Sequence, residues 1–401
     1  MNATIRKALS ITLTSALMAG CIAGCSQDLG PETLPSTTES TEETTPPTEE
    51  PTMVTTTENT ALTAVRIPST PIRSERPVDV NGQLKIEGAN IVNKNGDPYQ
   101  LRGISSYYIN ECADIFTDDV ISTLGYDWGC DVVRLAFNGD VNDDPGYAKA
   151  EEEYFNKICQ ITDALIDQGL YVIIDWQISE NGDPMQYKDT AIDFFSRISA
   201  IYGDKENILY EICSNPNGEL FDDTSSPVDW ARIKKYAKAA VAAIRENDPD
   251  NIIICGTRDF CREIGETAES PLKGDNICYA YHFFGGYSND DLSYFKEIED
   301  ARKKGLCIFV SEFYPTQDSE SYTFHLDDVK TWLDFLDSKN ISWVSWPLGS
   351  NGKIIYDAIN PLDSEFTAED RALGHWADIN ISMPGEFVRD RLKSYIVKPE
   401  G

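Results

Sequence analysis

The chain has 401 residues, of which 41% are hydrophobic and 10% aromatic, so it can build one large core or two ordinary ones. Asp and Glu number 67 against 34 Lys and Arg, which gives a formal net charge of −33. Such a field repels polyanions and excludes nucleic acid as the natural partner. The three histidines, His282, His325 and His375, form no His-x-x-x-His pair, which excludes a zinc site of the protease kind. We expect no metal and no cofactor.

The N-terminus has the pattern of an export signal. Arg6 and Lys7 precede an apolar stretch of small residues that ends at Cys25. The four residues that end there read Ile-Ala-Gly-Cys and resemble the lipobox of bacterial lipoproteins, in which the signal is removed before the cysteine and the thiol is acylated. We therefore expect residues 1–24 to be the signal and Cys25 to be the lipidation site. Cys21 is the competing site, and a plain secretory signal is the alternative. The mature chain would be exported and lipid-anchored to the bacterial cell membrane, facing outward.

Residues 25–78 have the composition of a disordered tether. The segment is rich in Thr, Pro, Glu and Ser, and its acidic residues between Asp28 and Glu58 are interrupted by no basic one. Such a composition cannot bury a core. As a flexible coil the tether would span roughly 40 Å between its ends, so the folded part would reach beyond the membrane surface.

The remaining segment, residues 79–401, alternates strand-like and helix-like patterns. The strand candidates are residues 100–105, 132–137, 171–176, 207–213, 252–256, 277–284, 306–313 and 341–348. Amphipathic stretches lie between them, such as 151–168, which Gly169 ends, and 229–247. Apolar strands that are each followed by a helix indicate a parallel sheet, and eight such units favour a (β/α)8 TIM barrel over an open doubly wound sheet. Residues 84–92 predict a β-hairpin that caps the N-terminal end of the barrel.

The ten cysteines of a chain with an export signal raise the question of disulfides. Cys213, Cys255, Cys278 and Cys307 lie in or beside strand patterns, where a small apolar residue is favoured. We interpret most of the cysteines as core thiols. The alternative is a set of disulfide bridges, with Cys255 and Cys261 as the first pair to test.

In such a barrel the chemistry lies at the C-terminal ends of the strands. The polar and aromatic residues there are Arg134, Gln177, Asn215, His282, Glu312 and Trp346. Glycoside hydrolysis needs two carboxylates that flank the bond, about 5 to 5.5 Å apart for retention of configuration. Only Glu312 qualifies by position. Glu211 precedes Asn215 by four residues in the same strand, which places it about 13 Å deeper and out of reach of a substrate.

These residues carry a resemblance that runs from Val92 to about Ser394. Over this range the chain resembles the cellulase-type members of glycoside hydrolase family 5, which are retaining endo-β-1,4-glucanases. The matching segments are LRGISS at 101–106, DVVR at 131–134, YVIIDW at 171–176, NILYEI at 207–212, DPDNIII at 248–254, YAYHF at 279–283, FVSE at 309–312 and SW at 345–346. The resemblance implies a β-1,4-glucan or a related neutral polysaccharide as the bound partner.

Carried over residue by residue, the resemblance implies a catalytic set that is only partly kept. Glu312 matches the nucleophile, Arg134 and Trp346 match the arginine of the second strand and the tryptophan of the eighth, and His282 is also kept. The family places Asn-Glu-Pro after the fourth strand, with the Glu as general acid/base. This chain has Asn215 at that position, so the usual acid/base is absent.

Other positions that the resemblance assigns to the substrate site are replaced as well. Gln177 stands in place of a histidine, Tyr107 in place of a substrate-binding histidine, and Phe284 in place of the tyrosine that bonds the nucleophile. Ser214 replaces an asparagine and shortens the reach toward the sugar 2-hydroxyl. The lysine-bearing loop after the last strand is not recognisable in residues 347–352. We therefore expect fewer contacts to glucan than in typical members of the family.

A positioned general acid is worth roughly 10²- to 10⁴-fold in rate, so its loss implies a barrier that is roughly 3 to 5 kcal/mol higher. Three carboxylates on nearby loops stay open as substitutes, namely Glu180, Asp183 and Glu219. We expect a cell-surface relative with lost or strongly reduced hydrolysis and a β-glucan-binding role. One alternative is an active retaining endoglucanase with a non-standard acid/base. The other is a pseudoenzyme that serves as a protein-interaction scaffold.

Each candidate also has a purely structural interpretation. Glu312 could form a structural ion pair, and Arg134, His282 and Trp346 could form a retained floor with no catalytic duty. Four aromatic residues are candidate sugar platforms for which burial in the core is the competing interpretation: Trp176, Phe260, Phe283 and Phe313. Of these four, Phe260 is kept as a substrate-binding candidate.

Overall fold

The computed structural model describes the chain in eight stretches: residues 69–139, 146–178, 182–216, 228–286, 293–316, 323–350, 357–359 and 366–397. The two candidate lipidation sites, Cys21 and Cys25, lie outside the described residues, as do Glu180 and Glu219. Within the described stretches, no helix combines the length and the apolar character needed to cross a membrane.

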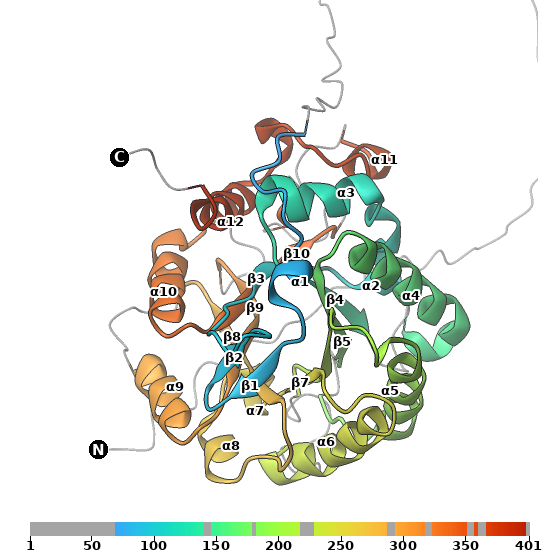
Figure 1. The fold of residues 1–401 in the computed structure, drawn as a ribbon, viewed down its shortest axis with the longest axis vertical. Coiled ribbons are helices and arrows are strands. Elements are labelled where there is room, and N and C mark those ends of the chain that lie inside the picture. Colours follow the sequence, from blue (N-terminus) through green and yellow to red (C-terminus); the bar gives the residue numbers. More distant parts are fainter. Residues whose placement is uncertain are drawn as a thin grey trace, which may run out of the picture. The chain divides into compact units, whose positions relative to one another are not determined.

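Among the described residues, eight parallel strands close into a barrel in the order β10-β3-β4-β5-β6-β7-β8-β9 (Figure 1). The strands are β3 Arg102–Ser106, β4 Val132–Asn138, β5 Tyr171–Gln177, β6 Ile208–Ser214, β7 Ile252–Cys255, β8 Ile277–Phe284, β9 Ile308–Tyr314 and β10 Ser342–Leu348. Each of these eight strands falls within two residues, at both ends, of the range that its apolar pattern predicts. The predicted (β/α)8 barrel is confirmed.

Helices surround the barrel wall on the outside (Figure 1). Those of ten or more residues are α4 Glu151–Asp167, α5 Lys188–Tyr202, α6 Trp230–Arg245, α9 Ser293–Lys303, α10 Leu326–Ser338 and α12 Met383–Ser394. The shorter helices are α1 Pro77–Asn81, α2 Ile109–Cys112, α3 Asp118–Ser122, α7 Arg258–Cys261, α8 Gly265–Glu269 and α11 Ala368–Arg371. Single 3-10 turns span Ala113–Ile115, Tyr147–Lys149 and Asp378–Asn380, and a π-helical turn spans Thr123–Trp128. In α4 the predicted apolar face is buried against the barrel.

The predicted N-terminal hairpin is present. Strands β1 Lys85–Glu87 and β2 Asn90–Val92 pair antiparallel and lie over one end of the barrel in Figure 1. Leu84 and Ile91 belong to the same apolar cluster as Val132 and Ile173 at the N-terminal halves of β4 and β5. The hairpin therefore closes the end of the barrel opposite the one at which the strands finish.

The folded domain extends further toward the N-terminus than composition suggests. Residues 69–78, which composition assigns to the tether, pack on the barrel. The Arg73 guanidinium donates to the Gly125 carbonyl at 2.9 Å and pairs with the Asp131 carboxylate at 2.7 Å. The guanidinium also donates to the Cys130 carbonyl, so Arg73 belongs to the folded domain through three partners that a composition count cannot reveal.

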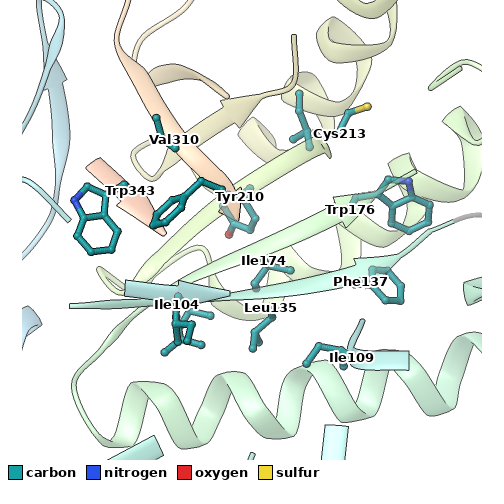
Figure 2. Close-up of a cluster of buried hydrophobic side chains, with 14 of the residues drawn as sticks. Ile104, Ile109, Leu135, Phe137, Ile174, Trp176, Tyr210, Cys213, Val310 and Trp343 are labelled. Atoms are coloured by element: carbon teal, nitrogen blue, oxygen red, sulfur yellow. The ribbon is translucent and has the colours of Figure 1, made fainter. Parts of the chain in front are cut away.

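Two apolar cores hold the barrel together. One lies between the strands and the surrounding helices, and it includes Ile104, Leu135, Trp176 and Trp343 (Figure 2). The other fills the interior toward the N-terminal end. The eight described cysteines are free thiols, and seven of them are buried, as the interpretation of core thiols predicts. The Cys255–Cys261 bridge is not formed.

Inside the barrel, the apolar core gives way to a polar layer over two residues of five strands. Residues two apart on a strand face the same side, so an apolar residue below and a polar one above form a pair. The pairs are Val132 and Arg134 in β4, Ile173 and Asp175 in β5, Leu209 and Glu211 in β6, Ala280 and His282 in β8, and Phe309 and Ser311 in β9. All five polar side chains are buried. This layer forms the floor of the end at which the strands finish.

Candidate functional site

One guanidinium organises three carboxylates in the polar layer. Arg134 Nη2 lies 2.8 Å from Asp175 Oδ2, Nε lies 2.7 Å from Glu211 Oε2, and Nη1 lies 3.5 Å from Glu312 Oε2. All four side chains are buried. Because one positive charge cannot neutralise three buried negative charges, the cluster favours the protonated form of at least one carboxyl group. Burial accordingly raises the pKa of Asp175 well above its usual range.

Glu312 is the carboxyl group of this cluster nearest the C-terminal ends of the strands. Its Oε2 atom is buried and accepts no hydrogen bond from the described residues. Burial raises the pKa of Glu312 to about 7, the neighbouring Glu211 adds to this, and Arg134 and a hydrogen bond from Asn215 oppose it. A nucleophile must be ionised, so this carboxyl group becomes competent only toward neutral and alkaline pH.

A β-bulge brings Glu312 and its neighbour to the site together. Between β8 and β9 the register runs from Ala280 opposite Phe309 to His282 opposite Glu312, so β9 holds one extra residue. Such a bulge turns two successive side chains toward the same side of a strand. Ser311 therefore reaches Glu211 and His282 while Glu312 reaches Arg134.

Asn215 occupies the place where the resemblance locates a general acid. It follows β6 directly and has a left-handed φ of 58°. Its side chain contacts His282 Nδ1 through Oδ1 at 2.9 Å and also donates a hydrogen bond to the Glu312 carboxylate. The amide thus stands beside the nucleophile position with both ends engaged, and an amide has no proton of suitable acidity to give a leaving group.

His282 connects Asn215 to the interior of the barrel. Its Nε2 atom lies 3.0 Å from Ser311 Oγ, and Ser311 Oγ lies 2.6 Å from Glu211 Oε1. Burial lowers the pKa of His282 well below its usual value, and the charges of Arg134 and Arg262 act in the same direction. The imidazole is therefore neutral at physiological pH.

An aromatic wall flanks the site on the side of β10. The Trp346 ring lies 5.8 Å from the Tyr107 ring and 5.7 Å from the Tyr314 ring, measured between centroids. Tyr107 is partly exposed and follows β3, and Trp346 is nearly buried. Rings of this kind offer a sugar an apolar face with a polar edge. The structure therefore places Trp346 and Tyr107 side by side.

Phe260 and Phe284 are both near the same arginine. The Arg262 guanidinium is 5.8 Å from the centroid of each ring. Phe284 also packs against Tyr314 at 4.2 Å. Phe260 belongs to a left-handed turn in which Asp259, Phe260 and Cys261 have φ of 54°, 55° and 61°. A run of three such residues is strained, and strain of this kind clusters at functional sites.

Several candidates do not face a ligand as expected. A bulge between Glu211 and Ser214 turns the Ser214 side chain inward, where Oγ donates to Asp175 Oδ2 at 3.0 Å. Ser214 therefore supports the floor and is not presented to a sugar. Gln177 is buried as well, but its Oε1 atom accepts no hydrogen bond from the described residues, so it stays a substrate-binding candidate. Asp183 is held by Arg232 in a two-point pair, with contacts of 2.8 and 2.6 Å, which commits it to a structural role.

The competing core interpretation holds for three of the four aromatic candidates. Trp176 is buried against Phe137, with ring centroids 5.4 Å apart. Phe283 stacks on Phe313 at 4.9 Å and on Trp332 of α10 at 4.4 Å. These rings pack between the barrel and its helices, and only Phe260 stays near the site.

Comparison with known proteins gives a consistent result. Residues 92–352 match the family model described as cellulase, glycosyl hydrolase family 5. The chain belongs to glycoside hydrolase family 5. It is 34% identical over 305 residues to Endoglucanase A of Evansella cellulosilytica, a match that covers 74% of this chain and 57% of that protein. It is also 34% identical over 322 residues to Endoglucanase N of Pectobacterium atrosepticum, with coverage of 80% and 68%. The chain thus spans little more than half the length of the first of these relatives.

Solved structures of the family have the same fold. The catalytic domain of Thermobifida fusca endoglucanase Cel5A superposes with a TM-score of 0.71 at 30% identity, covering 80% of this chain and all of that one. A cellulase designated Cel5C_n gives 0.71 at 33% identity, with coverage of 80% and 94%. The Thermobifida domain has also been solved in complex with cellotetraose.

Three residues of this family 5 site escaped the prediction from sequence. Asp175, Glu211 and Ser311 lie within strands whose sequences are mostly apolar, and the depth of Glu211 in its strand argues against a contact with substrate. Each follows an apolar interior residue by two positions, and this alternation was the available signal. No group of three or more His, Cys, Asp or Glu side chains within the described stretches is arranged to hold a metal ion.

Proposed function

We propose that this family 5 chain is a cell-surface protein that binds β-1,4-glucan or a related neutral polysaccharide and has lost most of its hydrolytic activity. The observation that carries the proposal is the position of Asn215. Its amide contacts Glu312, where a general acid would have to stand to protonate a departing sugar. An unactivated sugar alkoxide leaves poorly without such an acid.

The described carboxylates around Glu312 offer no substitute. Asp175 and Glu211 are buried and each is bonded to Arg134, which holds them below the site. Asp183 is bonded to Arg232. A group held in a charge pair at the barrel floor cannot reach the glycosidic oxygen on the far side of a sugar ring.

The binding role rests on the aromatic and neutral polar groups that the site presents. Trp346 and Tyr107 present adjoining rings, and rings of this kind stack on the apolar faces of sugars. Asn215, which follows β6, adds a neutral amide that His282 and Ser311 hold in place from below. Export and lipid anchoring at Cys25 form part of the same proposal, since the signal pattern and the acidic tether suit a protein that meets a polymer outside the cell.

The proposal is tested by measuring binding and cleavage on one sample. Calorimetric titration of the purified chain with cellotetraose should give a saturable heat, and chromatography of the same mixture should detect no shorter product. Trp346→Ala should weaken the binding at least tenfold, because it removes an aromatic face. Val397→Ala, an exposed position near the C-terminus, serves as the matched control and should leave the affinity unchanged.

The three possible results separate the competing functions. Binding without cleavage supports the proposal. Cleavage that Glu312→Gln abolishes would overturn it in favour of an active endoglucanase with a non-standard acid. An absence of binding to cellotetraose and to longer neutral glucans would overturn it in favour of a scaffold whose partner is a protein.

A further inference from the structure

Five side chains form a continuous hydrogen-bonded chain from the barrel floor to the nucleophile position. Glu211 contacts Ser311 at 2.6 Å, Ser311 contacts His282 Nε2 at 3.0 Å, and His282 Nδ1 contacts Asn215 at 2.9 Å. The opposite end of the Asn215 amide contacts Glu312. We call this series the proton chain; it has four links.

When both Glu211 and Glu312 are ionised, the proton chain has one proton fewer than it has hydrogen bonds. Ser311 has one hydroxyl proton, and a neutral His282 has one ring proton. Asn215 has His282 on one side and Glu312 on the other, and its amide nitrogen can donate to only one of them, because its carbonyl oxygen faces the other. These three groups supply three protons for four links. A complete chain therefore requires a fourth proton, which must lie on Glu211, on His282 or on Glu312.

Two of these three locations are disfavoured by their surroundings. Glu211 accepts directly from Arg134 Nε at 2.7 Å, and the short 2.6 Å contact from Ser311 suits a hydroxyl that donates to a charged carboxylate. A charged His282 is disfavoured by its complete burial and by the nearby guanidinium groups of Arg134 and Arg262. Both groups are thus better satisfied without the additional proton.

Glu312 is the remaining location and a suitable one. It is buried, its Oε2 atom accepts no hydrogen bond from the described residues, and its separation from the Arg134 guanidinium is 3.5 Å, longer than that of Asp175 or Glu211. The titratable and charged groups that face it are Arg134 from β4, Asp175 from β5, Glu211 from β6, His282 from β8 and Cys261 from the left-handed turn, with Arg262 beyond His282. Three of these groups are anionic or become so on ionisation, which disfavours a further negative charge.

We propose that Asn215 fixes a single shared proton on Glu312, so that the nucleophile position presents a neutral carboxylic acid rather than a carboxylate in the resting protein. The Glu312 hydroxyl donates to the Asn215 carbonyl, the amide nitrogen donates to His282 Nδ1, and the imidazole Nε2–H donates to Ser311. The oxygen and nitrogen of an amide have nearly the same shape, so a half-turn of the Asn215 side chain places them in this order. Asn215 and His282 are then positioning residues that set the protonation state of Glu312.

The consequence for glucan rests on the function proposed above, whereas the protonation itself does not. A neutral acid and a neutral amide donate to and accept from sugar hydroxyls without attacking the anomeric carbon. Asn215, which replaces the general acid, therefore also lowers the nucleophilicity of Glu312 by keeping it protonated. Ionisation of Glu312 leaves three protons for four links, so one hydrogen bond of the proton chain must break or reverse its direction. The ring nitrogens of His282 take part in two of these links, so their NMR signals must change.

The experiment is ¹⁵N NMR of the purified full chain with labelled histidine. The chain has three histidines, and the variants His325→Gln and His375→Gln assign two signals, which leaves the third to His282. At pH 6 we expect His282 to be neutral with its proton on Nε2. Between pH 6 and 8 its signals should shift with a midpoint near 7, in step with Glu312, whose pKa burial raises to about 7.

The matched control is Glu312→Gln, which donates through its amide as a protonated acid does and does not titrate. In this variant His282 should keep the Nε2 proton with no shift from pH 5 to 9. A proton on Nδ1 at pH 6 would place the shared proton on Glu211, and protonation of both nitrogens would place it on His282; either result overturns the proposal. A pH response that persists in Glu312→Gln also overturns it. The readout needs no glycan, so failure of glucan binding and failure of this inference are separate outcomes.

Discussion

At the scale of single residues, the site combines a retained nucleophile position with an altered partner. Glu312, Arg134, His282 and Asn215 meet as their positions at the strand ends predict. What the sequence could not reveal is that Asn215 contacts Glu312 directly, because the conformation of a side chain after a strand depends on the groups that surround it. The amide thus lies where the resemblance locates the general acid and also contacts the residue at the nucleophile position.

The raised pKa of Glu312 predicts a pH-dependent effect on stability. A carboxyl group whose pKa rises on folding binds its proton more tightly in the folded state, so its contribution to stability is present below about pH 4.5 and is lost as the pH rises to about 7. Glu312→Gln does not titrate, so this decrease in stability with rising pH is absent from the variant. Relative to the wild type, the variant should gain about 2–3 kcal/mol in free energy of unfolding between pH 4 and pH 8.

Urea denaturation at the two pH values measures this difference. Glu299→Gln, at a partly exposed position on α9 where the Lys339 ammonium lowers the carboxyl pKa, is the control and should show no comparable gain toward pH 8. A difference between wild type and Glu312→Gln that stays constant with pH would contradict the raised pKa.

At the scale of elements, the barrel strands follow from sequence far better than the connections that carry the site. Apolar runs predict β4, β5 and β6 almost to the residue, because burial on both faces demands such runs. The left-handed turn of Asp259 to Cys261 has no such signal. Its three residues carry side chains that disfavour positive φ, so only the surrounding packing determines this conformation. The bulges in β6 and β9 are likewise determined by packing against neighbouring elements and not by the local sequence.

The close approach of β6 and β7 beneath Asn215 predicts a position at which a methyl group is not tolerated. A Cβ added at Gly256 would lie 1.8 Å from the Cys213 carbonyl oxygen and 3.2 Å from Pro216, which follows Asn215. Gly256→Ala must therefore separate the two strands. We expect a loss of about 1–3 kcal/mol in free energy of unfolding.

Thermal or urea unfolding checks this expectation against Gly265→Ala. A Cβ at Gly265 meets only the end of the flexible Glu297 side chain, at 3.2 Å, so that variant should stay near wild-type stability. Equal stability of the two variants would contradict the close contact between β6 and β7.

At the scale of the whole molecule, the net charge of −33 distinguishes neutral from charged polymers. A field of this sign does not act on an uncharged glucan but repels an anionic one, and salt screens that repulsion. We expect the affinity for cellotetraose to be the same at 20 and 500 mM NaCl. The affinity for carboxymethyl cellulose should rise several-fold over the same range.

Hydroxyethyl cellulose, which is neutral and of comparable length, is the control polymer for calorimetry or affinity electrophoresis. Its binding should follow cellotetraose and not carboxymethyl cellulose. Affinity for the neutral polymer that falls with salt would show that charge, and not the aromatic wall of Trp346 and Tyr107, dominates recognition.

The most direct test of the account compares two leaving groups at pH 8, where Glu312 is ionised. In 2,4-dinitrophenyl cellobioside, Glu312 forms a bond to the anomeric carbon while the aryl oxide departs with its electron pair and needs no acid. We predict a burst of dinitrophenolate followed by slow turnover, because Asn215 cannot activate water for the second step, and no burst in Glu312→Gln. Cellotetraose should stay intact until Asn215→Glu restores an acid, with a gain of roughly 10²- to 10⁴-fold. Cleavage of cellotetraose by the wild type as fast as by Asn215→Glu would contradict the account.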